Sequence, residues 1–464
     1  MAANDPANAE MFRVYASRWI VLCCVVGLGL SSTLQFLSFA PIANVVDQFY
    51  CAGDCASSNH ATTAFAFATA LFLLVATWLA DTRGIRASLL LATPLLTVGG
   101  LLKIGSALEV TGGQLLNGCG YACILCLPVK VAGLWFPSAH RTLAVALGML
   151  GYPIGIMAGT LLTPLFVDRG DQILYLTVAL ACPGFLFGVL TVAGVRSGVP
   201  PTPPSASAGG EWLAFGAGIK KALRSGQYLL ICCFVGNMNG PLLAAVSVSQ
   251  QVLCPQGYSG TFIGVLSVVA TAGGLLFAPI CAAFLDRTKL YQETVKVVGA
   301  VGAMGCVAYT TLAHYRGMQY AIVPSALLFG ASTIVLLPTC MQLAAEATYP
   351  VPHAIIQGLA TASIQLGTAF YSAVLPFLAT DLEATPPWQV CTGDHSKDVQ
   401  PKDWRWPMVV LQCVVVVNIV TITVFLWPKH KRDALETGRG PRRGAKVAPV
   451  QGTTAQTGAM EQRF

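Results

Sequence analysis

Residues Trp78–Arg86 read WLADTRGIR, and residues Phe284–Gln292, about two hundred positions later, read FLDRTKLYQ. In each stretch an Asp is followed closely by basic residues, and each stretch lies between two long apolar runs. A charged loop that recurs at corresponding places in two halves of a chain indicates an internal repeat. In a chain with many apolar runs, such a repeat is typical of a membrane transporter.

The composition is that of a chain that lies mostly inside a bilayer. Hydrophobic residues make up 55% of the 464 residues and charged residues only 10%, whereas a soluble domain carries about 25% charged residues. A run of about twenty apolar residues is long enough to cross the hydrocarbon core. The sequence therefore predicts an all-α membrane protein with twelve transmembrane helices, arranged as two halves of six. The predicted spans are Trp19–Val46, Ala61–Ala80, Ala87–Ala107, Gly113–Phe136, Thr142–Val167, Ile173–Val195, Tyr228–Leu253, Thr261–Leu285, Val295–His314, Tyr320–Ala345, Ala354–Ala379 and Trp406–Trp427.

Lys and Arg are distributed unevenly between the two sides of the predicted bundle, and this sets the expected orientation. With the N-terminus in the cytoplasm, 21 of the 27 basic residues fall in cytoplasmic segments, and both termini are cytoplasmic. Four cysteines then lie on the outer side, where an oxidising environment permits disulfides: Cys51, Cys55, Cys254 and Cys391. We expect the protein in the plasma membrane rather than in an endolysosomal or mitochondrial membrane.

The two halves are separated by a stretch that is unsuited to a packed element. Val195–Trp212 reads VRSGVPPTPPSASAGGEW, and its Pro, Ser and Gly content is typical of a flexible linker. After it, Phe215, Ile219 and Leu223 can share one helix face with Lys220 on another, which favours an amphipathic helix at the cytoplasmic interface. The expected units are an N-terminal tail (1–17), a six-helix bundle (18–195), the linker with its amphipathic helix (196–226), a second six-helix bundle (227–427) and a basic tail (428–464).

Spans 4 and 10 each contain a Leu-Pro pair within an apolar helix. Pro128 lies in ILCLPVKVAGLWFP and Pro338 in IVLLPTCMQLAAEATYP. Because proline lacks an N–H and releases a carbonyl of the preceding turn, both are expected to kink their helices. Spans 5 and 11 carry GYPIG (Gly151–Gly155) and SIQLG (Ser363–Gly367) at matching positions. Such glycine-containing helices either bend during transport or pack closely through their small residues.

The two charged loops also resemble a known motif, which lies between helices 2 and 3 and between helices 8 and 9 of major facilitator superfamily transporters. Its residues here are Asp81, Arg83 and Arg86 in the first half, and Asp286 and Arg287 in the second. An Asp at the cytoplasmic end of a helix can pair with an Arg of a neighbouring loop or with a helix N-terminus. Such contacts hold the cytoplasmic ends of the two halves together. Positive-inside charge explains one such loop better than two, so we expect a gating role.

Residues that could carry enzymatic chemistry do not form a recognisable set. The six histidines fall in loops or at span ends, and the sequence has no phosphate-binding glycine loop, zinc-ligand spacing or Ser/His/Asp set. We therefore expect no catalytic residues, no metal site, no cofactor and no enzyme activity. The basic residues lack interleaved aromatics, which argues against nucleic-acid binding. The expected partners are the lipid bilayer and a small-molecule substrate, with the chain as a monomer.

Lys103 is the clearest charged residue within a predicted span. No Asp, Glu or His lies near the middle of a predicted span, and proton-coupled carriers usually need such a titratable group. The sequence therefore favours facilitated diffusion, or a coupling that does not use protons. Lys103 could be a counter-ion for an anionic substrate, but we expect its long side chain to reach outward to the membrane surface.

The candidate substrate-binding residues are neutral and polar, or aromatic. An amide buried at the level of the lipid costs free energy unless it is paired. Each of these residues could therefore bind either the substrate or a neighbouring helix. They are Gln35 and Phe36 in span 1, Tyr152 in span 5, Asn237 in span 7 and Gln365 in span 11.

Several stretches together resemble one transporter family. They are LQFLSFAPIANVV, TWLADTRGIR, LPVKVAGLWFP, SQQVLC, DRTKLYQET and EATYPVPH, and the similarity runs from about Arg18 to Trp427. On these motifs the chain is similar to the feline leukaemia virus subgroup C receptor-related transporters, solute carrier family 49. The resemblance implies a major facilitator fold, and transport of either choline and ethanolamine or haem.

The choline site of that family contains a Trp in span 1, an aromatic residue in span 7 and Gln residues in spans 5 and 11. By motif, Phe36 stands at the Trp position and Gln365 retains the Gln of span 11. Pro153 replaces the Gln of span 5, while Leu242 and Leu243 stand near the aromatic position of span 7.

The retained pair suits a small organic amine or cation of the choline or ethanolamine class, although Phe is a weaker cation–π partner than Trp. We place this class before haem because the retained Gln and aromatic position suit it better. No histidine lies in the expected pore to bind iron, although Cys, Tyr or Met could substitute. A receptor or scaffold that does not transport is an alternative of another class, and the two gating loops argue against it.

Overall fold

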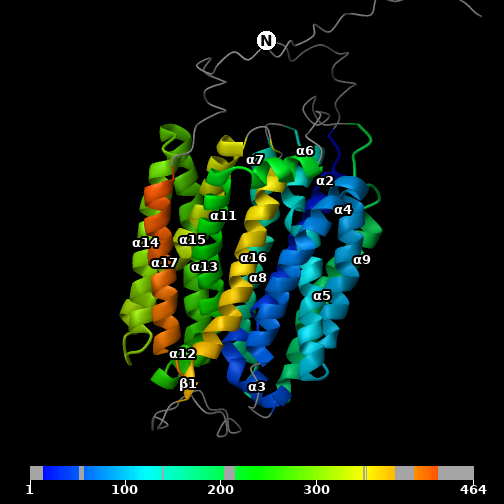
Figure 1. Cartoon of the computed structure of the whole chain (residues 1–464). Helices are drawn as coiled ribbons and strands as arrows, with labels where there is room; N and C mark the ends of the chain where they lie inside the picture. The colour runs from blue at the N-terminus through cyan, green and yellow to red at the C-terminus, as the bar shows by residue number, and fades with distance from the viewer. Residues whose placement is uncertain are drawn as a thin grey trace, which may run out of the picture.

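Long helices that run side by side form nearly all of the structure, a computed structural model (Figure 1). A short antiparallel strand pair adds to the predicted all-helical fold. The structure describes residues 14–51, 57–137, 140–202, 215–348, 351, 353–381 and 402–426. The first half contains α2 (Ser17–Phe36), the 3₁₀ helix η1 (Ala40–Ile42), α3 (Ala43–Cys51), α4 (Ser57–Leu102), α5 (Ala107–Leu125), α6 (Leu127–Trp135), α7 (Arg141–Met149), α8 (Gly151–Phe166) and α9 (Gln172–Gly194). The second contains α10 (Phe215–Leu223), α11 (Gly226–Ser247), α12 (Ser249–Leu253), η4 (Cys254–Gln256), α13 (Gly260–Thr288), α14 (Tyr291–Leu312), α15 (Gln319–Thr348), α16 (His353–Leu378), β1 (Thr380–Asp381), β2 (Lys402–Asp403) and α17 (Arg405–Phe425).

The described helices are consistent with the twelve predicted crossings. Ten helical stretches of the described residues are long and apolar enough to span a bilayer. One is α4, whose 46 residues would extend about 69 Å as a straight helix, while the hydrocarbon core is only about 30 Å thick. Gly84, with φ 84° and ψ 179°, interrupts α4, which therefore supplies two spans. α16, which is 26 residues long, adds a further crossing in contact with α11 and α4 (Figure 1).

Several predicted spans consist of more than one helical piece. Span 1 ends as α2 at Phe36 and continues through η1 into α3, and spans 5 and 7 are divided into α7–α8 and α11–α12. Span 4 is divided at Cys126, with Pro128 in the first turn of α6. A proline is tolerated there because an N–H in the first turn needs no partner within the helix. Pro338 instead lies within α15, which is assigned as one helix.

Each half has its own apolar core. Buried residues between Val21 and Val195 form one large cluster, and buried residues between Ala222 and Leu426 form another. The amphipathic helix α10 packs apolar side chains against the second cluster and leaves Lys220 exposed. The separate clusters explain how two bundles can keep their internal packing while their contacts with each other change.

Glycines bring the helices of the first half into backbone contact. On α8, Gly151, Gly155 and Gly159 recur at every fourth residue and therefore share one face, which lies against α2. A Cβ at Gly155 would lie 2.2 Å from Oγ1 of Thr33 and 2.4 Å from the carbonyl oxygen of Leu30. No side chain fits there without movement of the helices, so GYPIG provides close packing in this structure.

The second half repeats this contact between α11 and α16. A Cβ at Gly236 would lie 2.8 Å from the carbonyl oxygen of Ser363, and one at Gly240 would lie 2.8 Å from the carbonyl carbon of Gly367. The SIQLG motif therefore takes part in the contact that corresponds to the one made by GYPIG.

We predict that Gly155→Ala lowers the free energy of unfolding by about 1–3 kcal/mol, the usual cost of an inserted methyl group that forces a backbone shift. The matched control is Gly112→Ala, because a Cβ at Gly112 of α5 would meet nothing within 4 Å. Thermal unfolding of the purified protein in detergent measures both variants. Equal melting temperatures for Gly155→Ala and the wild type would show that α2 and α8 do not depend on this contact.

Candidate functional site

Four aromatic side chains from four helices form a continuous row in the first half. Phe36 of α2 stacks on Phe65 of α4, with ring centroids 4.2 Å apart and an interplanar angle of 22°. Phe65 is 5.3 Å from Tyr121 of α5, which meets Tyr152 of α8 edge-on at 5.5 Å and 86°. Contacts of this kind favour a fixed ring arrangement. We call Phe36, Phe65, Tyr121 and Tyr152 the aromatic row.

Helix contacts at glycine hold the far end of the aromatic row in place. A Cβ at Gly29 would lie 2.7 Å from Cε1 of Tyr152, so the ring packs directly on α2. The Tyr152 hydroxyl donates a hydrogen bond to the carbonyl oxygen of Ile124, at 3.2 Å. The sequence analysis selected Phe36 and Tyr152 but missed Phe65 and Tyr121. For Tyr121 a signal was available, since a Tyr directly after Gly118 and Gly120 stands out in an apolar span.

The second half contributes an aliphatic surface beside Phe36. Leu243 and Val246 of α11 pack against the small apolar cluster that contains Phe36, Leu37 and Phe65. The family motif has an aromatic residue in this part of span 7. The aromatic row therefore faces aliphatic side chains of α11, and the aromatic surface lies mainly in the first half.

Gln35 lies next to Phe36 in sequence, and its carbonyl oxygen and Oε1 belong to a buried polar cluster, whereas its buried Nε2 has no hydrogen-bond partner among the described residues. The ammonium of Lys103 donates to the Gln35 carbonyl oxygen at 3.4 Å and to Gln35 Oε1 at 3.3 Å. Gln114 Nε2 donates to the same carbonyl oxygen at 3.1 Å. Lys103 is only 2% exposed, so the expectation that it reaches outward was wrong. The end of α2 frees carbonyl groups, and these give the ammonium partners inside the protein.

Gln365 and Asn237 lie in the second half and have different surroundings. Gln365 on α16 is 4% exposed, and its side chain makes no hydrogen bond to another residue of the described ranges. Asn237 on α11 accepts a hydrogen bond from the Tyr371 hydroxyl at 2.6 Å and donates to the carbonyl oxygen of Cys233 at 3.0 Å. Of the two amides, Gln365 is therefore the one whose hydrogen-bonding groups are available to a solute.

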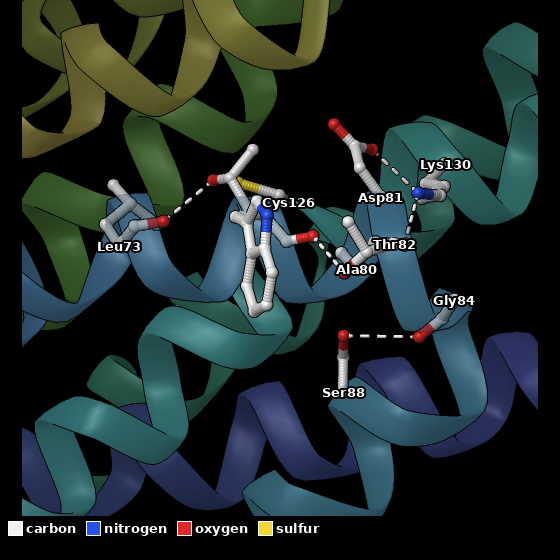
Figure 2. Close-up of polar contacts among 10 residues, drawn as sticks. Leu73, Ala80, Asp81, Thr82, Gly84, Ser88, Cys126 and Lys130 are labelled. Carbon is white, nitrogen blue, oxygen red and sulfur yellow. Dashed lines mark hydrogen bonds and ion pairs between the residues drawn. The ribbon is translucent and has the colours of Figure 1, made fainter. Parts of the chain in front are cut away.

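An ion pair lies at the end of the bundle that we predict to be cytoplasmic. The Lys130 ammonium is 2.7 Å from Asp81 Oδ1 and also donates to the carbonyl oxygen of Ala80 (Figure 2). The pair joins α4 to α6, so within the described residues Asp81 is bound inside its own half. Arg86 donates to the carbonyl oxygen of Arg196 at 2.8 Å, which ties the loop to the end of α9.

The remaining predicted gating residues are less constrained. The side chains of Arg83 and Arg287 are exposed, and the side chain of Asp286 lies outside the part that the structure describes. The loops nevertheless share one backbone feature. Gly84 and Lys289, each three residues after its Asp, have positive φ angles of 84° and 57°. The two loops therefore share a positive φ at the same position, although the ψ angles differ, 179° at Gly84 and 16° at Lys289.

The two halves touch at both ends of the bundle. At the end that we predict to be exterior, called the outer end below, Asn59 Nδ2 of α4 donates to Gln251 Oε1 of α12 at 3.1 Å. At the other end, a Cβ at Gly358 of α16 would lie 3.5 Å from Oγ1 of Thr77 and 3.9 Å from Sγ of Cys126. Among the described residues, the two halves therefore contact each other near both ends of the bundle, and Phe36 and Gln365 are buried.

The outer end has two further covalent and polar restraints. Both carboxylate oxygens of Asp47 accept hydrogen bonds from Ser58 in the first turn of α4, from its amide at 2.9 Å and its hydroxyl at 3.2 Å. Cys254, one of the four cysteines predicted to be exterior, is disulfide-bonded. Cys51 and Cys55, two more of these four cysteines, lie outside the residues whose side chains are described.

Comparisons with known proteins agree with this architecture. The chain matches the family model described as Major Facilitator Superfamily over residues 21–372. It is 29% identical over 442 residues to Solute carrier family 49 member A3 of Danio rerio, which covers 92% of this chain and 91% of that protein. It is 27% identical over 375 residues to the Choline/ethanolamine transporter flvcr2b of Danio rerio, which covers 76% of each. Among solved structures it is similar to the xylose transporter XylE from E. coli in a partially occluded inward-open conformation, with a TM-score of 0.65 and 14% identity over 89% of this chain and 99% of that one.

Proposed function

We propose that this chain, which belongs to the Major Facilitator Superfamily, carries a small organic amine or cation of the choline or ethanolamine class. Membership of the family makes it a multi-pass membrane transporter and not an enzyme. The finer assignment is supported by the relatives named as choline/ethanolamine transporters. It rests above all on one observation, the aromatic row that begins at Phe36.

An aromatic row suits a soft cation because ring faces attract positive charge without requiring a carboxylate. Phe36 and Phe65 supply stacked rings, while Tyr121 and Tyr152 add rings that also bear hydroxyl groups. The amide of Gln365, which makes no hydrogen bond to another described residue, supplies a neutral hydrogen-bonding group for a hydroxyl or amino group of the solute. Haem would need an axial ligand, and His60, His140 and His314 lie near helix ends rather than beside the row.

Alternating access then requires each end of the bundle to open in turn. We assign the outer closure to the Asn59–Gln251 hydrogen bond and the inner closure to the contact of Gly358 with Thr77 of α4 and with Cys126 between α5 and α6. The Asp81–Lys130 pair stiffens the inner end of the first half. The charged loops would thus act by fixing the shape of the surface that closes.

We predict that Gln365→Ala and Phe36→Ala each weaken solute binding by about 1–2 kcal/mol, the size of one lost hydrogen bond or an equivalent packing contact. Uptake of labelled choline and ethanolamine into proteoliposomes, with haem uptake as a parallel assay, measures the effect. Phe36→Trp is the informative gain-of-function change, because Trp is the better cation–π partner. It should increase the affinity for choline.

The matched control is Asn237→Ala, whose amide is already bonded within its own half. This variant should transport with nearly wild-type affinity. If Phe36→Ala and Gln365→Ala both leave the affinity for every transported solute unchanged, the solute binds elsewhere. Saturable haem uptake without amine uptake would replace the proposed substrate class.

We also predict that an imposed proton gradient does not drive uptake. The buried carboxylate of Asp47 lies near the outer end of span 1 and is bonded to the start of α4, not in the middle of the path. Uptake into proteoliposomes at equal and unequal pH should therefore be the same for the wild type and for Asp47→Asn. A stimulation by external acid that a protonophore abolishes would contradict this prediction.

For the inner end, we predict that Asp81→Asn and Lys130→Met each reduce the transport rate several-fold while membrane insertion is preserved. Both remove the same ion pair, so they should resemble each other. The exchanged double variant, Asp81→Lys with Lys130→Asp, should recover part of the rate. Wild-type rates in Asp81→Asn and Asp286→Asn would exclude a gating role for the loops.

A further inference from the structure

The carbonyl end of α2 is bound by more donors than a helix end ordinarily has. α2 ends at Phe36, so the carbonyl group of Gln35 has no amide partner within the helix. It accepts from Ser38 Oγ at 3.3 Å, Gln114 Nε2 at 3.1 Å and Lys103 Nζ at 3.4 Å. Three donors thus converge on one carbonyl group, directly before a residue of the aromatic row.

Lys103 is the unusual member of this group. Its ammonium makes no ion pair with a carboxylate of the described residues, although it is 2% exposed and a buried charge is costly unless it is paired. Its compensation comes from Gln35 and from the ring of Phe39, whose centroid is 5.9 Å away. A helix C-terminus also carries partial negative charge, which favours a cation there.

The second half shows that the fold does not require this cation. α11 ends at Ser247, one residue after Val246, just as α2 ends one residue after Gln35. Ser249 Oγ donates to the Val246 carbonyl oxygen at 2.7 Å, as Ser38 does to that of Gln35. Ala313, fully buried, follows the end of α14 where Lys103 follows the end of α4.

Where the first half has its polar cluster, the second half has a small apolar cavity. Val246, Ser249, Tyr309 and Ala326 help to line it. Ala326 is the eighth residue of α15, as Gln114 is of α5. A serine and small apolar side chains are therefore enough to end the equivalent helix. The lysine and the glutamine of the first half are additions that the architecture alone does not explain.

We propose that Lys103 is a positioning residue, which together with Gln114 fixes the carbonyl end of α2 and so holds Phe36 in the aromatic row. Tyr50 of α3 donates to the carbonyl oxygen of Lys103, so the same residue also joins the outer piece of span 1 to span 3. Span 1 has a break between the end of α2 at Phe36 and the start of α3, which contains η1. Lys103 thus contacts span 1 on both sides of this break. The effect of Phe36 on solute binding rests on the proposed function. The fixing of the end of α2 by Lys103 and Gln114 does not depend on it.

Hydrogen–deuterium exchange of the protein in nanodiscs tests the restraint without any substrate. The amides of Ala40 and Ile42 bond to carbonyls within the break, so their exchange reports its opening. In Lys103→Met this exchange should become about tenfold faster, as expected for the loss of a hydrogen bond to a charged group. Lys103→Arg, which keeps the charge, should restore most of the protection.

The matched control is Lys130→Met, the same substitution at the opposite end of the first half, which should leave exchange within the break unchanged. Unchanged exchange in Lys103→Met would overturn the inference, and so would an equal increase along the whole chain. If Lys103→Met does not assemble, Gln114→Leu removes another donor to the same carbonyl group and must accelerate exchange at Ala40 and Ile42. Wild-type exchange in that variant would equally overturn it.

Choline uptake by Lys103→Met tests whether the restraint matters for solute binding. A displaced Phe36 should raise KM while leaving the maximal rate near that of the wild type, whereas a general loss of folded protein lowers only the rate. A changed exchange rate with unchanged KM would confirm the restraint and place the solute away from Phe36. The two proposals are therefore separated by the pair of measurements.

Discussion

The close approach of α8 to α2 is the contact on which the first half depends. Because Gly151, Gly155 and Gly159 lack side chains, the two backbones come within reach of each other along several turns. The Tyr152 ring can then rest on Gly29 and extend the aromatic row from α8 toward α2. A corresponding contact joins α11 to α16 through Gly240 and Gly367. The repeat thus preserves backbone contacts more strictly than side-chain identity.

The two halves have diverged where the solute is proposed to bind. The first half contributes aromatic rings and a polar cluster that stabilises the end of α2, while the second contributes aliphatic residues such as Leu243 and Val246. Under the proposed function, the aromatic surface for the solute comes from the first bundle, while the second adds aliphatic side chains and the amide of Gln365. Each half has a large apolar core of its own, so movement of one half against the other would change mainly the contacts between the halves, among them those of Leu243 and Val246 with the cluster that contains Phe36.

Sequence reasoning predicted the features that depend on composition along the chain. The apolar runs predicted the spans, and the recurrence of Asp81 and Asp286 predicted the two charged loops. It identified Phe36 and Tyr152 singly but not the connection through Phe65 and Tyr121, because that connection depends on how four helices are rotated about their axes. The burial of Lys103 was mispredicted for a related reason. Its partner is a carbonyl group freed by a helix break, and hydropathy does not reveal where a span will break.

The backbone at the two charged loops makes them unequal despite their similar sequences. Gly84 has space around it, since a Cβ would meet nothing within 4 Å, yet its φ of 84° and ψ of 179° belong to a region that is essentially restricted to glycine. Lys289 ends α13 in the ordinary left-handed conformation, φ 57° and ψ 16°, which other residues adopt at modest cost. Substitution of Gly84 is therefore costly because of its backbone conformation and not because of neighbouring atoms. Position 289 of the second loop can accept other residues.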